Sequence, residues 1–314
     1  MKRFLLCLIL PALALCACGG GASPAETAET VRIGAMKGAT AIGLAKYMED
    51  APDGVSFDVV TADEIVPLLI RGEIDMAAIP SNLAATLYNN TNGAIRVVAV
   101  NTLGLTYIVE TGDTIGSVQD LRGKTIAAAG KGTPPEITLR HILTQNGLDP
   151  DQDVTMEFRN EPAEVVAWLK QNGGVAMLPQ PFVTTAMDNV EGLREALDLT
   201  AEWDKLDSSG TLIIGVFAAR ADFLERKDAA AVLRDYRASV GWVNENPAAA
   251  APIVEKLGIA PSGVAERAIP KCRLTFVEGA EMREMLEAYL AVLFANAPET
   301  VGGAMPGDDF YYVP

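Results

Sequence analysis

Histidine is nearly absent from this 314-residue chain, which contains a single one, His141. Clusters of histidine ligands for zinc and most Ser-His-Asp triads are therefore excluded as working hypotheses. Basic residues are also scarce: 25 lysines and arginines stand against 41 acidic residues, for a formal net charge of −16. So acidic a chain is repelled by nucleic acid and by anionic lipid, and we expect no nucleic-acid partner. We also expect no metal and no cofactor.

The N-terminus carries an apolar run too short to cross a membrane. Lys2 and Arg3 precede the run, which extends from Phe4 to Leu15 and is interrupted by Pro11. A membrane-spanning helix needs about 20 apolar residues, so this run is typical of a signal peptide. The length and the 49% apolar content of the whole chain predict about two folded domains after it.

The end of the run, Leu15-Cys16-Ala17-Cys18-Gly19-Gly20, resembles a bacterial lipoprotein box. We expect cleavage after residue 17 and lipid, including palmitate, on Cys18; the alternative is an ordinary cleaved secretory peptide. Residues 18–30 contain no large apolar side chain and predict a flexible tether. The protein would then lie in the bacterial cell envelope, in the periplasm or on the outer face of the cytoplasmic membrane. Cys272 would remain as a lone, buried cysteine without a disulfide partner.

Short apolar stretches alternate with helical ones along the rest of the chain. Strands are predicted at 31–36, 57–61, 76–80 and 96–101, with helices at 41–48, 63–71 and 82–89 between them. The pattern repeats from 106 to 218, and a helical region extends from 229 to 296. This alternation is typical of βαβ units, so we predict an α/β fold with mainly parallel sheets.

The sequence lacks complete versions of the common enzyme motifs. Gly123-Lys124-Thr125 ends like a phosphate-binding loop, but Val118 stands where that loop needs a glycine. The sequence has no G-x-S-x-G motif, and His141 lies within a predicted helix, where a structural role is expected. We therefore do not expect an enzyme.

Four predicted strands end in small or polar turns that lead directly into helices. They are 36–40, 80–82, 130–134 and 179–181. In open α/β sheets, ligands bind beyond the carboxyl ends of strands, where helix N-termini offer unpaired N–H groups. The alternative is purely structural, since Thr40, Ser81, Asn82 and Thr133 would all serve as N-caps.

Several of these segments carry a family resemblance. They are Val31-Arg32-Ile33-Gly34, the stretch GEIDMAAIP at 72–80, DLRGKTI at 120–126 and LPQPF at 178–182. On these residues, the chain from Val31 to about Trp242 resembles the periplasmic-type solute-binding proteins of ABC importers. The branch in question is that of nitrate, sulfonate, taurine and thiamine-precursor binders. Its enzymatic members use a cysteine-rich motif that this chain lacks.

The resemblance implies a type II periplasmic-binding-protein fold, with two α/β lobes joined by two hinge crossings. Lobe 1 would comprise 31–103 plus 211–314, with the helical C-terminal part packed on it, and lobe 2 would comprise 104–210. The crossings would lie near 102–105 and 209–211, where Gly104 and Gly210 could absorb a hinge rotation.

The same resemblance places a ligand between the lobes. The candidate ligand-binding residues are Lys37, Gly38, Thr40, Ser81, Asn82, Asn101, Thr102, Gly132, Thr133, Gln180 and Thr211. Lys37 is a cation at a strand end, where an anionic group would dock; a solvated loop lysine is the alternative.

Our leading hypothesis is a monomeric, lipid-anchored binding protein. It would capture a small polar or anionic solute and deliver it to the permease and ATPase subunits of an ABC importer. The alternatives are a small-molecule enzyme, such as a lyase or transferase, and a ligand-sensing lipoprotein on the same scaffold. Sulfonate, nitrate, pyrimidine and flavin ligands are not distinguished by these residues.

Overall fold

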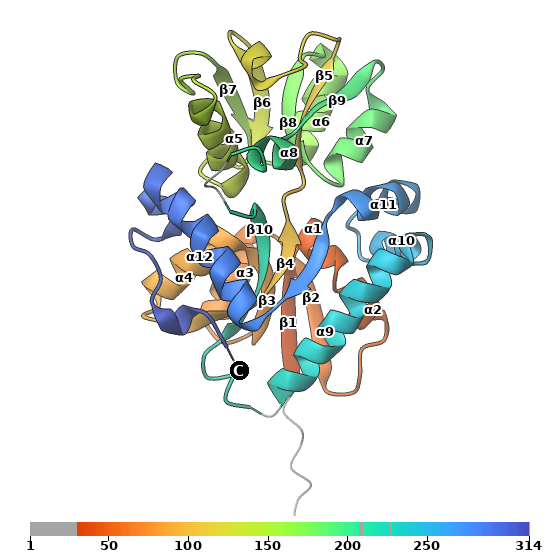
Figure 1. Cartoon of the computed structure of the whole chain (residues 1–314). Helices are drawn as coiled ribbons and strands as arrows, with labels where there is room; N and C mark the ends of the chain where they lie inside the picture. The colour runs from red at the N-terminus through yellow and green to blue at the C-terminus, as the bar shows by residue number, and fades with distance from the viewer. Residues whose placement is uncertain (1–29, 207–209, 227, 314) are drawn as a thin grey trace, which may run out of the picture.

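The strands of the molecule form two separate sheets, one in each of two lobes (Figure 1). The computed structural model describes residues 30–206, 210–226 and 228–313. The predicted signal peptide, Cys18 and nearly all of the predicted tether lie outside the described residues.

Lobe 1 is built on a six-stranded sheet in the order β11-β4-β10-β3-β1-β2. Its strands are β1 Val31–Met36, β2 Val55–Val60, β3 Met76–Pro80, β4 Ile95–Leu103, β10 Ile213–Arg220 and β11 Leu274–Val277. Both faces of this sheet are covered by helices, so its inner strands are rich in apolar residues, as in β3, where Met76 to Ile79 are all buried.

The helices of lobe 1 come from both ends of the chain. Helices α3 (Ala62–Ile70), α4 (Ser81–Asn90) and α12 (Gly279–Asn296) pack on one face, and α1 (Ala39–Ile42), α2 (Ala45–Glu49), α9 (Asp228–Glu245), α10 (Pro247–Lys256) and α11 (Ser262–Ala268) on the other. The predicted helix at 41–48 is therefore two short helices, which meet at Gly43. A Cβ at Gly43 would lie 3.2 Å from Val240 of α9, so this close packing depends on glycine.

Lobe 2 has a five-stranded sheet in the order β7-β6-β8-β5-β9. Its strands are β5 Thr106–Thr111, β6 Thr125–Ala129, β7 Thr155–Arg159, β8 Val175–Pro179 and β9 Leu193–Asp198. Its α-helices are α5 Pro134–Gln145, α6 Pro162–Asn172, α7 Phe182–Asn189 and α8 Leu199–Trp203. Four short 3₁₀ segments complete the described chain: η1 Val118–Leu121, η2 Ile269–Lys271, η3 Pro298–Val301 and η4 Asp308–Phe310.

Most strands of each sheet run in the same direction, as predicted, but each sheet also contains at least one reversed strand. In lobe 1, β10 runs antiparallel to both β3 and β4; in lobe 2, β5 runs antiparallel to both β8 and β9. Both β5 and β10 are the first strand after the chain has passed from one lobe to the other. Such a strand enters its sheet from the edge where the other strands end, so it must run in the opposite direction.

Two strands were not predicted. The sequence LREALD of β9 is rich in helix-forming residues, and it becomes a strand by pairing with β5. The four-residue β11 pairs with β4 beside the first crossing. The predicted α/β fold with two lobes, two crossings and a helical C-terminal part on lobe 1 is confirmed.

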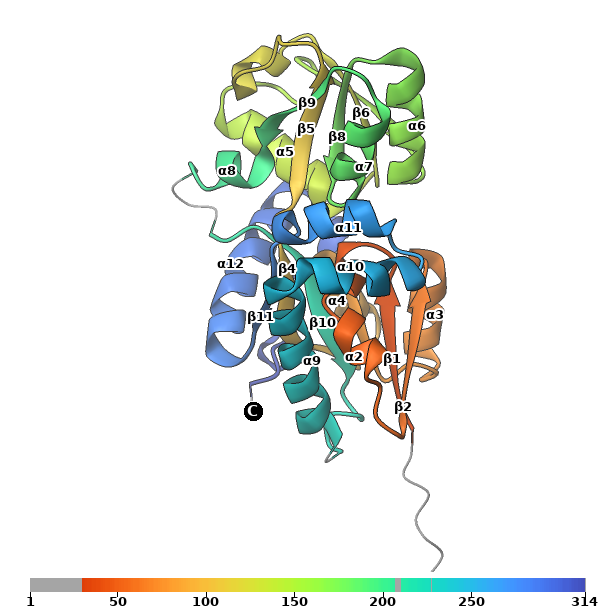
Figure 2. The same cartoon turned by 90° about the vertical axis from the view of Figure 1, so that its right-hand side faces the viewer.

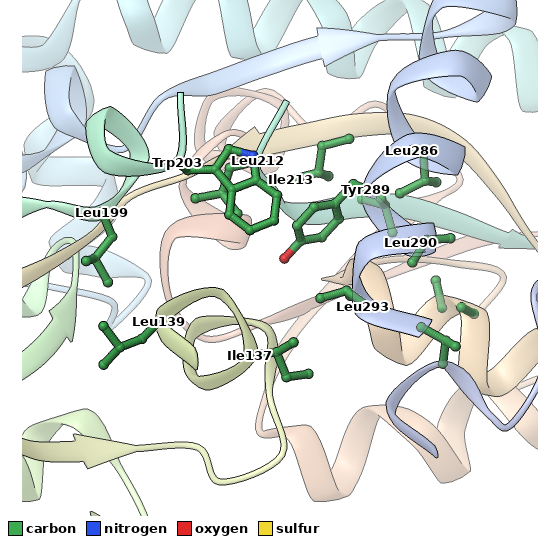
Figure 3. Packing of buried hydrophobic residues seen from close by; sticks show 14 of the residues in the cluster. Ile137, Leu139, Leu199, Trp203, Leu212, Ile213, Leu286, Tyr289, Leu290 and Leu293 are labelled. Carbon is green, nitrogen blue, oxygen red and sulfur yellow. The ribbon is translucent and has the colours of Figure 1, made fainter. Parts of the chain in front are cut away.

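One hydrophobic cluster continues from lobe 1 into lobe 2 (Figure 3). Trp203 of α8 lies against Tyr289 of α12, and Ile137 and Leu139 of α5 belong to the same cluster. The two lobes are thus not merely tethered by two chain crossings; on this flank they share a packed core. Among the described residues, no helix has both the length and the hydropathy needed to span a membrane.

Candidate functional site

The carboxyl ends of the strands in the two lobes face each other. In lobe 1, β1, β3 and β4 run in the same direction, and β4 ends at Leu103, where the chain crosses into lobe 2. In lobe 2, β6 and β8 run opposite to β5, which starts just after that crossing, so they end at the same boundary. The four turns singled out in the sequence all follow β1, β3, β6 or β8, and the topology brings them to this boundary.

On the lobe 1 side, three candidate residues surround a glycine of β10. A Cβ built on Gly215 would lie 2.5 Å from Asn101 Oδ1, 2.8 Å from Thr40 Cγ2 and 3.1 Å from Thr102 Cβ. Gly215 also pairs with Pro80, the residue before Ser81. These positions come from four segments far apart in the sequence, and the absence of a side chain at Gly215 is what lets them meet.

Asn101 and Thr102 are buried at the end of β4, with 1% and 0% exposure. The Thr102 hydroxyl donates a 3.0 Å hydrogen bond to Asn101 Oδ1, which fixes the carboxamide. Tyr236 of α9 lies behind Asn101; burial raises the pKa of this tyrosine, and the adjacent Asn101 amide opposes that rise. The phenol is therefore neutral, and this end of β4 offers polar groups without charge.

Helix α4 begins without a side-chain cap. Its N-cap residue is Pro80, and no side chain accepts a hydrogen bond from its first turn. The cap roles considered for Ser81 and Asn82 are wrong, because the Ser81 hydroxyl donates to Ile213 O at 3.0 Å and Asn82 Nδ2 donates to Thr300 O at 3.3 Å. The first main-chain N–H groups of α4 therefore point into the boundary uncapped. Asn82 itself is directed towards η3 instead.

The turn after β1 presents an exposed lysine. Lys37 is exposed, and its main-chain N–H donates to Val60 O at 3.0 Å, which anchors the turn to β2. Gly38, with φ +140°, takes the N-cap position of α1. The N-cap role considered for Thr40 is therefore wrong, and its hydroxyl instead donates to Met36 O at 3.0 Å. Thr211 is half-buried at the second crossing.

On the lobe 2 side, a glutamate occupies the start of α5. Glu136, only 5% exposed, accepts a 2.6 Å hydrogen bond from the Gly132 N–H and a 2.8 Å bond from Arg140 Nε. Thr133 does take the N-cap position, and its hydroxyl donates to Gly130 O. Sequence reasoning missed Glu136, although a glutamate three residues after a predicted N-cap is a recognisable signal.

Gln180 lies at the first crossing. Its main-chain N–H donates to Leu105 O at 3.0 Å, and its side-chain oxygen accepts from the Thr184 hydroxyl at 2.8 Å. Within the described residues, Gln180 Nε2 and the neighbouring Thr106 hydroxyl are buried without a hydrogen-bond partner. Two such unpaired buried groups lie next to the interlobe boundary, where buried polar atoms normally have a partner. Thr106 was not among the predicted residues, because nothing local distinguishes it from any strand threonine.

The single histidine and the cysteine of the described residues are both buried as packing groups. Cys272 is fully buried, and burial raises its pKa to about 12. Burial lowers the pKa of His141, while a hydrogen bond with Asn296 opposes that effect; its ring lies 5.1 Å from that of Trp203. The structural interpretation of both residues is confirmed. In the described ranges, no group of three His, Cys, Asp or Glu side chains is placed to hold a metal ion.

Two cavities lie away from the boundary. One, of about 430 Å³, is lined by Met48, Phe57 and Leu257 among others, beside the edge strand β2. The other, of about 310 Å³, lies at the opposite pole of lobe 1, between Arg32, Asp75 and Arg220. Neither includes a residue of the four turns.

Solved structures with the same fold are numerous. An ABC transporter protein from Parabacteroides distasonis superimposes with a TM-score of 0.78 at 24% identity, covering 91% of this chain and 98% of that one. The periplasmic aliphatic sulphonate-binding protein SsuA from Escherichia coli gives 0.72 at 20% identity, covering 91% and 92%. The nitrate-binding protein NrtA from Synechocystis PCC 6803 gives 0.63 at 17% identity, covering 88% and 84%.

Sequence comparisons place the chain in a family. A search of curated protein sequences finds no significant match. The family model described as "ABC transporter, phosphonate, periplasmic substrate-binding protein" matches residues 39–236, which is more than half of the chain and includes the turns after β3, β6 and β8. The chain therefore belongs to the periplasmic substrate-binding proteins of ABC transporters, in the family named for phosphonate.

Proposed function

We propose that this protein captures a small anionic or strongly polar solute between its lobes while it is anchored to the membrane by lipid on Cys18. Its family supplies ABC importers with substrate, so permease and ATPase subunits are its expected partners, and the protein works by binding rather than by turnover. The enzyme and sensor alternatives have no comparable support.

One observation carries the proposal. The uncapped start of α4 follows Pro80, which pairs with Gly215, and Thr40, Asn101 and Thr102 surround Gly215. On the lobe 2 side of the boundary, Gln180 and Thr106 carry buried polar atoms without a hydrogen-bond partner. Free main-chain N–H groups and neutral polar side chains suit the oxygens of an anion. Lys37 adds the positive charge. Two structural relatives are named for sulphonate and nitrate, and the family is named for phosphonate. All three are small oxyanions.

Solute binding in such a site stabilises the protein through lobe closure. A solute that touches both lobes binds the closed arrangement more tightly, and it shifts the population by that difference in affinity. The strongly negative net charge repels anions at long range, but salt screens this over about 8–10 Å. The local groups of the site therefore decide affinity.

The test is a thermal-shift panel with methylphosphonate, ethanesulfonate, nitrate and a pyrimidine. A solute at 100 times its dissociation constant adds about 2.7 kcal/mol to the folded state and raises the melting temperature. We expect an oxyanion to give this shift. A response to the neutral pyrimidine alone would contradict the proposed solute class.

Two variants then locate the site. Gly215→Ala places a methyl group against Asn101 and Thr40 and should weaken binding, whereas Gly241→Ala, where a Cβ meets open space, should not. Lys37→Ala should weaken binding of a charged solute, with the exposed Lys170→Ala of α6 as the control. Unchanged affinity in both Gly215→Ala and Lys37→Ala would show that the solute binds elsewhere on the protein.

A further inference from the structure

Three cations from one short segment of lobe 1 pair with three carboxylates of lobe 2. Arg267 Nη1 lies 2.9 Å from Asp188 Oδ1, Lys271 Nζ lies 2.6 Å from Glu195 Oε1, and Arg273 Nη2 lies 2.7 Å from Asp198 Oδ2. The Arg267–Asp188 pair is bidentate, because the second guanidinium nitrogen bonds the second carboxylate oxygen. The cations span the last turn of α11, η2 and the residue before β11; the carboxylates belong to α7 and β9.

The Arg273–Asp198 pair lies beside the first crossing, and the Lys271 and Arg267 pairs lie progressively farther from it. The Arg273 carbonyl accepts a 3.2 Å hydrogen bond from the N–H of Leu103, the last residue of β4 before the chain enters lobe 2. Lys271 and Arg267 follow at greater separation, and Figure 2 shows α11 extending beneath α7 away from that point. A rotation of the lobes about the crossings therefore moves Arg267 and Asp188 apart more than Arg273 and Asp198.

The opposite flank of the boundary is held differently. There, Trp203 and Tyr289 pack within the shared hydrophobic cluster, together with Leu293 and Ile137 (Figure 3). Apolar packing of this kind is nearly insensitive to moderate salt. The Arg267 and Asp188 side chains are 55% and 36% exposed, so their attraction is screened by salt.

We propose that Arg267, Lys271 and Arg273 with their three carboxylates form an ion-pair latch that favours the closed lobes and raises solute affinity without touching the solute. This inference rests on the proposed function, since it assigns residues that set the strength of the same interlobe site. By linkage, any contact that exists only in the closed arrangement raises the population competent to hold the solute. Exposed pairs are individually weak, so the loss of one should lower affinity about two- to fivefold.

The experiment measures lobe separation without solute. Donor and acceptor dyes are attached through non-canonical amino acids at the exposed Asn90 of lobe 1 and Gln171 of lobe 2 in the full-length protein. Energy transfer is compared for wild type, Arg267→Gln, and the charge swap Arg267→Asp with Asp188→Arg. The control is Arg122→Gln, because Arg122 is similarly exposed but pairs with Asp153 inside lobe 2.

We expect Arg267→Gln to lower energy transfer, and the charge swap to restore it. Raising the salt from about 50 mM to about 1 M, where the Debye length falls to about 3 Å, should lower transfer in wild type and in Arg122→Gln alike. Equal transfer in wild type and Arg267→Gln, or a loss that the charge swap does not restore, would overturn the latch. Failure of the solute panel would instead count against the proposed function, since the separation is measured with no solute present.

Discussion

Trp203 of α8 and Tyr289 of α12 meet edge to face across the lobe boundary, with ring centroids 5.7 Å apart. Neither side chain is exposed, and the Trp203 indole N–H donates a 2.8 Å hydrogen bond to the carbonyl of Gly210 at the second crossing. One aromatic pair thus joins the C-terminal helix of lobe 1, the last helix of lobe 2 and the chain that connects them.

Replacing Trp203 by alanine should destabilise the whole molecule. The substitution empties the centre of a cluster shared by both lobes, and large-to-small changes at such positions cost about 3–5 kcal/mol. Urea unfolding measures the loss. Trp168→Ala, at a half-buried position on α6, is the matched control and should cost less. Equal losses for the two variants would show that the shared cluster adds nothing to stability.

Gly104→Ala should destabilise the first crossing. A Cβ there would lie 2.3 Å from Thr200 Oγ1 and 2.6 Å from Leu212 Cδ2, so the two crossings would be forced apart. Overpacking of this kind costs about 1–3 kcal/mol. Gly263→Ala on α11, where a Cβ meets open space, is the comparison. The melting temperature should fall in the first variant only; a neutral Gly104→Ala would mean that the crossings yield easily.

Glu136→Gln should cost more stability than Glu164→Gln. Both glutamates stand at the third position of their helices and accept from the main-chain N–H two residues before the helix, Glu136 from Gly132 and Glu164 from Asn160. Glu136 is buried and also bonded to Arg140, whereas Glu164 is exposed. Charged hydrogen bonds of this kind contribute about 1.5–3 kcal/mol. Chemical denaturation distinguishes the pair, and equal effects would refute a special role for Glu136.

Stability should fall below about pH 6.5 because of His141. Burial lowers its pKa in the folded state, so the unfolded chain takes up the proton first. The contribution of the neutral ring is complete above the unfolded value of about 6.5 and is lost as the pH falls towards the lower folded value. His141→Gln should therefore reduce the fall in melting temperature below about pH 6.5 relative to wild type. An identical slope in both proteins would exclude His141 as its source.

Labelled palmitate should appear in the protein when the gene is expressed in a bacterial host. We expect Cys18→Ser to abolish the label and to release the protein from membranes, because stable anchoring needs acyl chains. Cys16→Ser should keep the label. Labelling that survives in Cys18→Ser, or that disappears in Cys16→Ser, would reassign the lipid.

The broad fold could be predicted because its signals are local. Buried strands such as Met76–Pro80 are continuous apolar runs bounded by turn residues. Some helices also have a local start signal, as α3 does with Thr61 at its N-cap and Glu64 in its first turn. Strand β9 gave no such signal, since its Leu, Glu and Ala residues favour helices and only pairing with β5 makes it extended.

The candidate site could be predicted only by its location. Turns after four strands indicated where polar residues gather, but not which of their atoms remain available. Asn82 bonds to Thr300, more than 200 residues away, and the Gly132 N–H is taken by Glu136. Gly215, which lets Thr40 and Asn101 approach each other, is an ordinary strand glycine in the sequence.

The sequence by itself determined the alternation of strands and helices, the polar turns and the family, because these depend on neighbouring residues and their order. Tertiary structure alone decided that β5 and β10 run against their sheets, that Trp203 meets Tyr289, and that Arg267 meets Asp188. Contacts between residues about 80 apart leave no periodic trace in a chain. They exist because burial of apolar surface brings distant segments together, and charge pairing then acts on whatever that burial has placed side by side.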